Sequence, residues 1–381
     1  MSILSKGLEA LNRVIPKKNI IVFNSFPDFS DNSYELYKYI VGNRSDLLKE
    51  YKLVWTKTGS VNLEKIDLHP DTVILEKKSL RGIWAFLRAK YVITTHGYFQ
   101  QVRSGKNQLQ ISLWHGCGYK SIPPAERGYR GDTTIVTSSA YSQKFCEYFC
   151  VDAEHVKITG YPRNDRLFHA QDTLSKLGID KRKYSRIAIW MPTYRKAGFG
   201  HDEVDGLVDS LLASNFSKEE CDQLNDRLRE CNILLIIKPH PMDSATLEKF
   251  KELSNICCYT TQELQQFNVG LYDLLAETDL LLSDYSSVVV DYLLTDKPIA
   301  MVLSDIEEYQ QSRGFLFEPI EEYFPGPIIS KFDELLEYFE NMEPINQEWE
   351  KKRKQIKTYL HKYWDDKSSE RVADMIWGSN K

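Results

Sequence analysis

The chain has 381 residues, of which 42% are hydrophobic and 27% charged, and its formal net charge is −5. This length suits two domains, because a single hydrophobic core rarely grows beyond about 250–300 residues. A net negative charge argues against binding driven by nucleic-acid phosphates, so we expect no nucleic-acid partner.

The cysteines and the hydropathy pattern indicate the compartment. The seven cysteines form no CxxC pair, and their odd number leaves one thiol over in any disulfide framework. A reducing cytoplasm is therefore expected. No stretch reaches the roughly 20 apolar residues of a membrane span, and the N-terminus lacks the apolar core of a signal peptide. We expect a cytoplasmic protein that does not cross a bilayer.

Residues 1–18 are predicted to form an amphipathic helix. Its apolar stripe consists of Leu4, Leu8, Leu11 and Ile15. Its cationic side chains are Lys6, Arg13, Lys17 and Lys18. Such a helix either lies on a membrane surface or packs on the first domain, and the sequence leaves both readings open. With the first reading, the protein would be peripheral on the inner face of the cell membrane.

Apolar, β-branched runs of strand length then alternate with helical patterns such as 80–89 and 140–149. In the first half we predict strands at 19–26, 51–56, 72–75, 91–95, 109–114, 133–137 and 156–160. In the second half we predict them at 186–191, 233–237, 256–259, 280–283 and 299–303. This alternation indicates parallel sheets covered by helices on both faces.

Two doubly wound α/β domains are expected, comprising residues 19–166 and 186–344. The polar stretch 167–185 is interpreted as the linker between them. Residues 345–381 have a helical pattern that ends in an apolar stripe at Val372, Met375 and Ile376. A terminal helix that returns to brace the first domain would have this pattern.

Ligands of doubly wound sheets lie beyond the carboxyl ends of the strands, so functional residues are expected at the strand ends. The segment 280–292 (LLLSDYSSVVVDY) ends an apolar strand in hydroxyls and a carboxylate. Ser286 and Ser287 are N-cap candidates for a helix over 288–294, and a helix start of this kind favours a phosphate. The alternative is an ordinary helix cap.

Two other strand ends carry a histidine. In 113–120 (LWHGCGYK), His115 is placed as a general base, and Lys120 could compensate anionic charge. In 236–241 (IIKPHP), His240 stands between two prolines that fix its backbone, and Lys238 shares its face of the strand. A pyrophosphate would explain both cations. The alternatives are a histidine that caps a turn and a plain strand-ending turn.

Arginines follow two more strands, and an aromatic loop follows the last one. Arg163 in 160–165 and Arg195 in 191–195 are candidate phosphate clamps, although either could instead form an ion pair at a domain interface. The loop over 313–327 is dense in aromatic residues, glycine and proline. It could cover a base or a glycerol-sized group, or plug the core beneath the terminal helix.

Taken together, these motifs resemble the CDP-glycerol glycerophosphotransferase family, the teichoic-acid primases and polymerases of bacterial cell envelopes. The resemblance runs from about residue 93 to residue 327, and its motifs occur in family order. They are WHG…K at 114–120, GYPRND at 160–165, PTYR at 192–195, KPHP at 238–241, SDYSSVVVDY at 283–292, DKPI at 296–299 and RGF…FPGP at 313–327.

The resemblance implies a GT-B-like fold, with two Rossmann-like domains facing a cleft and a C-terminal helix crossing back. It also implies transfer of glycerol phosphate, or of a related polyol phosphate such as ribitol phosphate, from a CDP-activated donor to an acceptor hydroxyl. CMP would leave. The expected partners are CDP-glycerol or CDP-ribitol and a lipid-linked, polymer or glycan acceptor. The role of the reaction would be teichoic-acid or capsule-like polymer synthesis.

The same resemblance assigns roles to individual residues. The family's two histidines correspond to His115 and His240. Its donor site corresponds to Asp284, Ser286 and Ser287, and its RGF motif contains Arg313. Lys238 and Arg195 are placed with the donor, and Lys120 and Arg163 on the acceptor side. No Asp-x-Asp cluster presents itself, so no metal ligand is assigned and the need for a divalent cation stays open.

Two other functions remain as alternatives. A GT-B glycosyltransferase or sugar-nucleotide epimerase shares the fold and uses a nucleotide-diphosphate donor, but an acidic residue for the ribose is found only at Asp284. A non-catalytic envelope-assembly protein would not require both His115 and His240. Residues 117–119 depart from the family pattern after WHG, which leaves the acceptor's identity open.

Overall fold

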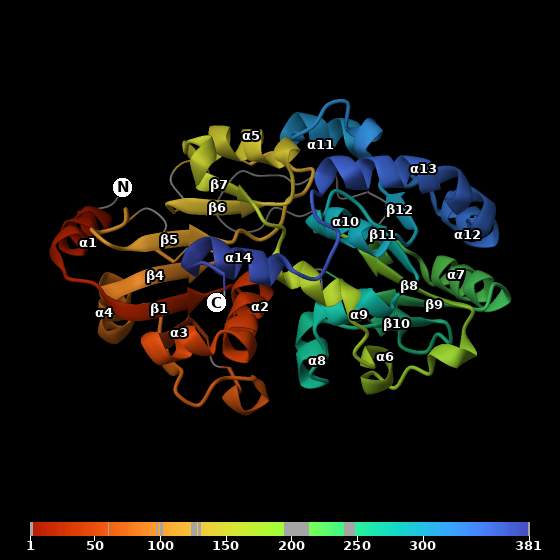
Figure 1. Cartoon of the computed structure of the whole chain (residues 1–381). Coiled ribbons are helices and arrows are strands. Elements are labelled where there is room, and N and C mark those ends of the chain that lie inside the picture. The colour runs from red at the N-terminus through yellow and green to blue at the C-terminus, as the bar shows by residue number, and fades with distance from the viewer. Residues whose placement is uncertain are drawn as a thin grey trace. The chain divides into compact units, whose positions relative to one another are not determined.

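The computed structural model describes residues 3–59, 61–96, 98–99, 102–122, 128, 131–193, 213–239 and 248–379. The chain forms two compact units (Figure 1). The first unit comprises Met1–Cys117, Pro124–Asp165 and Leu360–Lys381, and the second comprises Gly118–Pro123 and Arg166–Tyr359. The chain thus enters the second unit twice, the first time for six residues only.

Within the described residues, the first unit contains one parallel sheet of seven strands. In sheet order these are β3 (Val73–Glu76), β2 (Lys52–Lys57), β1 (Lys18–Asn24), β4 (Ala89–Thr94), β5 (Leu109–Ser112), β6 (Thr133–Val136) and β7 (Val156–Ile158). The strand order reverses between β1 and β4. This reversal is the topological switch point at which Rossmann-like sheets bind ligands.

Alternating side chains of the central strands bury both faces of this sheet. On one face Val22 belongs to a cluster with Phe86 of α4 (Leu80–Arg88). On the other face the next residue, Phe23, packs on Trp55 of β2 and on Tyr37 of α2 (Asp31–Asn43). Apolar residues at successive positions therefore serve opposite faces, as expected for a sheet covered on both sides.

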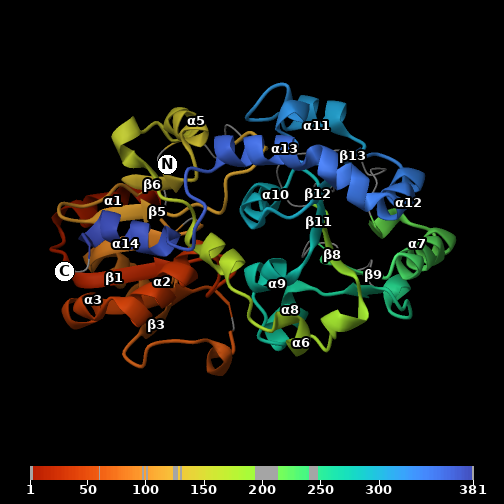
Figure 2. The same ribbon diagram turned by 45° about the vertical axis from the view of Figure 1, so that its right-hand side comes forward.

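Helix α14 (Ser368–Trp377) belongs to the first unit and lies beside α2 in both ribbon views (Figure 2). Its amino end is capped by the Asp165 carboxylate, whose two oxygens accept the backbone N–H of Ser368 and of Ser369 at 2.8 Å each. Farther along, Asp374 forms an ion pair with Arg44 at 3.7 Å. The predicted return of the terminal helix to the first domain is confirmed.

The N-terminal helix α1 (Ile3–Val14) packs beside α4 and divides its apolar residues between two environments. Leu8 is buried in the cluster that contains Phe86. Leu11 and Val14 are exposed instead, with 49% and 74% of their surface accessible. The other α-helices described in this unit are α3 (Ser45–Glu50) and α5 (Ser139–Phe149).

The second unit repeats the same topology. Its parallel sheet consists, over the described residues, of β10 (Ile256–Cys258), β9 (Ile233–Ile237), β8 (Arg186–Met191), β11 (Leu280–Ser283), β12 (Ile299–Val302) and β13 (Ile328–Ile329), in that order. Here the order reverses between β8 and β11. The two-residue strand β13 is the one that sequence analysis missed, because it is too short to show a periodic pattern.

The helices of the second unit cover both faces of its sheet. Those described are α6 (Thr173–Lys176), α7 (Lys218–Glu230), α8 (Thr261–Gln266), α9 (Leu271–Glu277), α10 (Ser287–Tyr292), α11 (Ile306–Ser312), α12 (Phe332–Glu340) and α13 (Met342–Leu360). On one face Trp190 and Leu282 share a core with Leu224 of α7 and Leu335 of α12. No helix of the described residues is both long and apolar enough to span a membrane.

Candidate functional site

In the first unit, the site is built on the turn that follows β5. Trp114 and Gly116 both have positive φ angles, +51° and +119°, so the backbone reverses sharply on either side of His115. The side-chain amide of Asn32, in the first turn of α2, donates to the carbonyl oxygens of Leu113 and Trp114 at 3.2 and 2.9 Å. These bonds hold a turn whose backbone conformation is costly for a tryptophan.

Arg163 holds the same turn from a second direction. Its guanidinium is buried and its Nη1 donates to the His115 carbonyl oxygen and to Asp31 Oδ1, both at 2.9 Å. Its backbone N–H donates to Asn32 Oδ1 at 3.1 Å. The bonds described for Arg163 therefore fix the backbone that carries His115, and its predicted contact with the acceptor stays a prediction.

The imidazole of His115 contacts two aromatic rings. The ring centroid of Trp114 lies 4.1 Å away at an angle of 31°, and that of His96 lies 4.6 Å away at 15°, which is a stacked arrangement. His96 follows β4 and was missed in the sequence. The signal that could have found it is the one used for His115, a histidine and a glycine directly after an apolar strand.

In the second unit, Asp284 joins the ends of β8 and β11 at the switch point of the sheet. Its Oδ2 accepts hydrogen bonds from the backbone N–H of Thr193 at 2.9 Å and from Thr193 Oγ1 at 2.8 Å. Ser283 adds a bond from its hydroxyl to the Met191 carbonyl oxygen at 2.6 Å. The PTYR and SDYSS motifs are thus adjacent, and Thr193 is a residue of this corner that sequence analysis did not single out.

The helix start predicted after β11 is confirmed. Ser286 is the N-cap of α10, and its hydroxyl accepts from the Val288 N–H at 3.4 Å. Ser287 is the first residue of the helix. Gly118 packs directly against it: a Cβ atom at Gly118 would lie 3.1 Å from the Ser287 Cα and 3.3 Å from its backbone nitrogen. A Cβ at this position would be in unusually tight contact with α10, whose backbone would have to move by a few tenths of an ångström.

The residues after Gly118 run along the aromatic loop. Lys120 pairs with Phe315 in an isolated antiparallel bridge. The Ser121 N–H donates to the Gly314 carbonyl oxygen at 3.0 Å, and the Leu316 N–H donates to the Tyr119 carbonyl oxygen at 2.8 Å. Lys120, predicted beside the acceptor together with His115, therefore belongs to the second unit, where its Nζ lies 5.6 Å from the Tyr309 ring centroid.

Aromatic packing fixes the loop over 313–327 to the same corner. Tyr285 of the SDYSS motif packs on Phe315 at 5.1 Å and on Tyr309 at 4.2 Å between ring centroids. Phe324 is fully buried and contacts the ring of Tyr119 at 5.7 Å. Of the two roles considered for this loop, these rings serve core packing. Arg313 is the C-cap residue that follows α11, and its predicted contact with the donor stays a prediction.

Lys238 is a buried cation at the end of β9, with only 8% of its surface accessible. Its ammonium group donates to Thr261 Oγ1 at 3.2 Å, and no described carboxylate forms an ion pair with it. Burial lowers the pKa of Lys238 below its ordinary value. An anion at this position would supply the charge that the described part of the protein does not.

Two predicted residues, Arg195 and His240, lie outside the described residues. Their roles therefore stay predictions.

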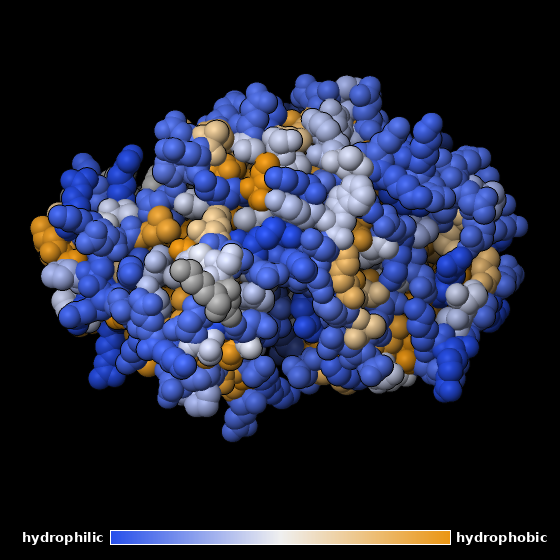
Figure 3. Space-filling view, in the orientation of Figure 1, coloured by the Kyte–Doolittle hydropathy of each residue, from blue (hydrophilic) through white to orange (hydrophobic). Residues whose placement is uncertain are grey.

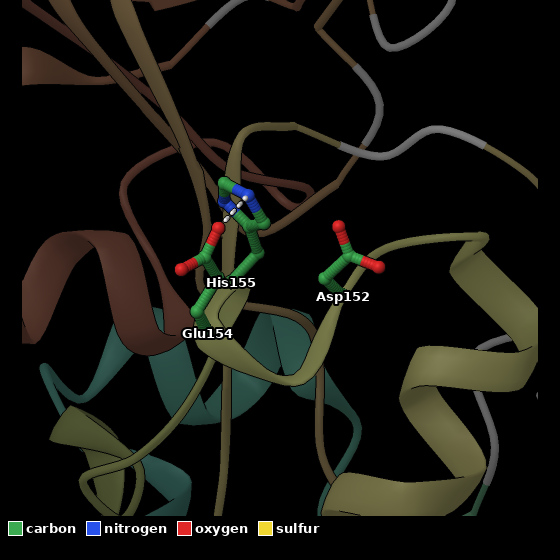
Figure 4. A group of neighbouring side chains, drawn as sticks. All are labelled: Asp152, Glu154 and His155. Carbon is green, nitrogen blue, oxygen red and sulfur yellow. Dashed lines mark ion pairs between the residues drawn. The ribbon is translucent and has the colours of Figure 1, made fainter.

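Across the described residues, one group could share a metal ion: Asp152, Glu154 and His155, whose candidate ligand atoms lie within 4.8 Å of one another (Figure 4). The Nε2 atom of His155 lies 3.5 Å from the Glu154 carboxylate, and its Nδ1 lies 2.7 Å from the Asp132 carbonyl oxygen. Both acids are exposed, and the group precedes β7, at the edge opposite to the strand ends described above. It contains none of the motif residues.

Comparison with known proteins identifies the family. The family model described as CDP-glycerol:poly(glycerophosphate) glycerophosphotransferase matches residues 8–378, so the chain belongs to that family. Among curated relatives, it is 26% identical to the teichoic acid ribitol-phosphate polymerase TarL of Staphylococcus aureus over 96% of this chain. This chain is also 28% identical, over 71% of its own length, to a teichoic acid ribitol-phosphate primase of Bacillus spizizenii.

The matches differ in how much of each relative they span. The chain spans 63% of TarL and 70% of the primase, but 94% of a teichoic acid glycerol-phosphate transferase of Staphylococcus aureus, with 23% identity. Among solved structures, the wall teichoic acid polymerase TagF superposes with a TM-score of 0.76 at 21% identity, covering 98% of this chain and 92% of TagF. The predicted GT-B-like class is confirmed.

Because the ammonium group of Lys238 is buried, replacing it should have opposite effects on the stability of the protein and on its affinity for an anionic ligand. Lys238→Met should stabilise the protein by about 1–3 kcal/mol at pH 7, because it removes a buried charge that no described carboxylate neutralises. The same change should weaken binding of CDP-glycerol, the donor in the family's description, at least tenfold. Chemical denaturation and titration calorimetry measure the two effects.

The stability effect should depend on pH. In the unfolded chain the lysine titrates near its ordinary pKa of 10.5, and in the folded protein it titrates lower. The unfolded state therefore binds more protons between these two values, and the stability of the parent protein rises with pH across that window. The gain in unfolding free energy of Lys238→Met over the parent protein should be full below the pKa of Lys238 in the folded protein. It should be absent above the pKa of the unfolded chain. A variant that is destabilised at pH 7 would contradict this account.

The close approach of Gly118 to α10 gives a separate prediction. Gly118→Ala should raise the dissociation constant of CDP-glycerol about three- to tenfold, because the new Cβ must displace the backbone of Ser287. Gly42→Ala is the matched control, since a Cβ at Gly42 of α2 would meet nothing within 4 Å. Equal affinities of the two variants would show that the position of α10 does not affect donor binding.

Proposed function

We propose that the protein transfers a polyol phosphate from a CDP-activated donor to an acceptor hydroxyl, releasing CMP. The observation that carries the proposal is the meeting of three distant motifs in the second unit. The segment that follows His115 places Gly118 against Ser287 of SDYSS and Lys120 against Phe315 of the RGF motif. Packing of this kind supports a common task for motifs that are some 170 to 200 residues apart.

The chemistry follows from the nature of the donor. The acceptor hydroxyl oxygen attacks the β-phosphorus, a new P–O bond forms, and the bond between that phosphorus and the oxygen of CMP breaks. His115 accepts the proton of the hydroxyl as general base. Lys238, the hydroxyls of Ser286 and Ser287, and His240 would stabilise the charge that develops on CMP and on the phosphates.

The relatives support the donor class without fixing the polyol. The family description names CDP-glycerol, and a structure of a histidine-to-asparagine variant of TagF has been solved after a soak with CDPG. Curated relatives include polymerases of both ribitol phosphate and glycerol phosphate. We therefore propose CDP-glycerol or CDP-ribitol as donor, and a lipid-linked or polymer acceptor of teichoic-acid or capsule-like synthesis at the cytoplasmic side of the membrane.

The function is tested by CMP release from CDP-glycerol and CDP-ribitol with a panel of lipid-linked and soluble acceptors. His115→Ala and His240→Ala should each lower acceptor-dependent release by a factor of about 10² to 10⁴, the usual contribution of general acid–base catalysis. His155→Ala is the matched control, because His155 lies outside the motifs, and it should retain full activity. It also tests whether the group at Asp152 and Glu154 takes part.

Two outcomes would overturn the proposal. One is CMP release that does not depend on His115. The other is no release from either CDP-polyol with any acceptor while a UDP- or GDP-sugar is consumed, which would make the protein a glycosyltransferase.

We also propose that the first unit binds an anionic membrane surface through an apolar patch on α1 and α4. The patch consists of Leu11, Val14, Leu80 and Trp84, which are 49%, 74%, 87% and 51% exposed. Figure 3 shows apolar atoms at the surface around α1. Exposed cations lie within three residues of these side chains in the sequence, namely Arg13, Lys78 and Arg81. Apolar side chains bordered by cations are typical of interfacial helices.

Sedimentation with vesicles tests this patch. Leu80→Ser combined with Trp84→Ser should weaken binding to phosphatidylglycerol-containing vesicles at least tenfold, since each buried apolar side chain contributes about 1.5–3 kcal/mol. Phe267→Ser is the matched control, because Phe267 is 47% exposed and belongs to the second unit. If the parent protein stays in the supernatant with these vesicles at low salt, the membrane proposal is wrong.

A further inference from the structure

His96 occupies the position in the first sheet where a ligand is most expected. Strand β4 borders the switch point, and Thr94 at its end is in register with Ser112 of β5. His96 lies two residues beyond Thr94, and His115 lies three residues beyond Ser112. Two neighbouring parallel strands therefore each deliver an imidazole to the same edge of the sheet, next to the switch point.

The residue before His96 is firmly anchored. Thr95 is buried, and its hydroxyl lies 2.7 Å from the Ser33 hydroxyl and accepts the Ser33 N–H of α2 at 3.0 Å. Its own N–H donates to the Asn24 carbonyl oxygen of β1 at 3.1 Å. His96 thus extends from a backbone that is tied to both β1 and α2, which limits how far its ring can move.

The two histidine rings are stacked at 4.6 Å with an angle of 15° between their planes. Asn32 and Arg163 fix the backbone on either side of the His115 side chain, and the rings of Trp114 and His96 both contact its imidazole. A flat neighbour of fixed position restricts both torsions. We propose that His96 is a positioning residue that holds the imidazole of His115 in the orientation that receives the acceptor's proton; this rests on the function proposed for His115.

The groups around His96 support a neutral ring. Burial is the main cause that lowers its pKa, the charges of Arg163 and Lys77 lower it further, and Asp31 opposes them. The neighbouring imidazole of His115 acts in the same direction whenever it is protonated. A neutral His96 stacks on His115 without repelling the proton that His115 must accept.

Kinetics with two substitutions tests the positioning role. His96→Ala removes the flat neighbour and should lower kcat for CMP release about tenfold or more, with the KM of the CDP-polyol unchanged. His96→Phe keeps a ring and should retain kcat within about threefold. Melting temperatures verify that both variants fold. A wild-type kcat in His96→Ala, or equal losses in the two variants, would overturn the proposal.

A spectroscopic measurement separates this proposal from the function of His115. The carbon-bound ring protons of His115, followed by NMR without substrate, are shifted by the ring currents of Trp114 and His96. The part due to His96 should be kept in His96→Phe and lost in His96→Ala. In His115→Phe, the pKa of His96 should rise, because a protonated imidazole beside it disfavours a second positive charge. If His115→Ala stays active while these shifts appear, the catalytic role of His115 fails but the stacked pair stands. If the shifts are absent, the pair itself is disproved.

Discussion

The constraint on which the site depends is the conformation of residues 113–121. The first half of this stretch is tied into the first unit, where Asn32 and Arg163 bind the carbonyl oxygens of Trp114 and His115. The second half is tied into the second unit by Gly118 and by the pairing of Lys120 with Phe315. Cys117 is itself held in the first unit, where its Sγ lies 2.9 Å from the Tyr161 hydroxyl, so the boundary between the two units falls between residues 117 and 118.

Much of the fold could be predicted because parallel strands buried on both faces are continuous apolar runs, such as 186–191 and 233–237. The strand β13 has only two residues and escaped detection. The strand predicted at 109–114 ends at Ser112, because the backbone of Trp114 has a positive φ. The strand propensity of tryptophan gives no sign of this conformation. Membership of residues 118–123 in the second unit rests on contacts nearly 200 residues away, which no local pattern can reveal.

The candidate site shows the same division between local and tertiary information. Ser286 was recognisable as a cap because the cap lies next to its helix in the sequence. Arg163 and Lys238, in contrast, look alike as cations at strand ends, and only tertiary structure separates them. Arg163 is paired with Asp31, whereas the described partner of Lys238 is a hydroxyl. Of the two buried cations, Lys238 therefore remains the one suited to receive an anionic ligand.

The cap of α14 by Asp165 also bears on the order in which the protein can fold. Asp165 is the last residue of the first unit before the chain passes into the second, and the helix that it caps is synthesised after all of residues 166–359. During translation, the sheet of the second unit is complete while the first unit still lacks α14. Domains commonly fold from the N-terminus as they emerge. Of these two units, the N-terminal one is instead the last to receive all of its chain.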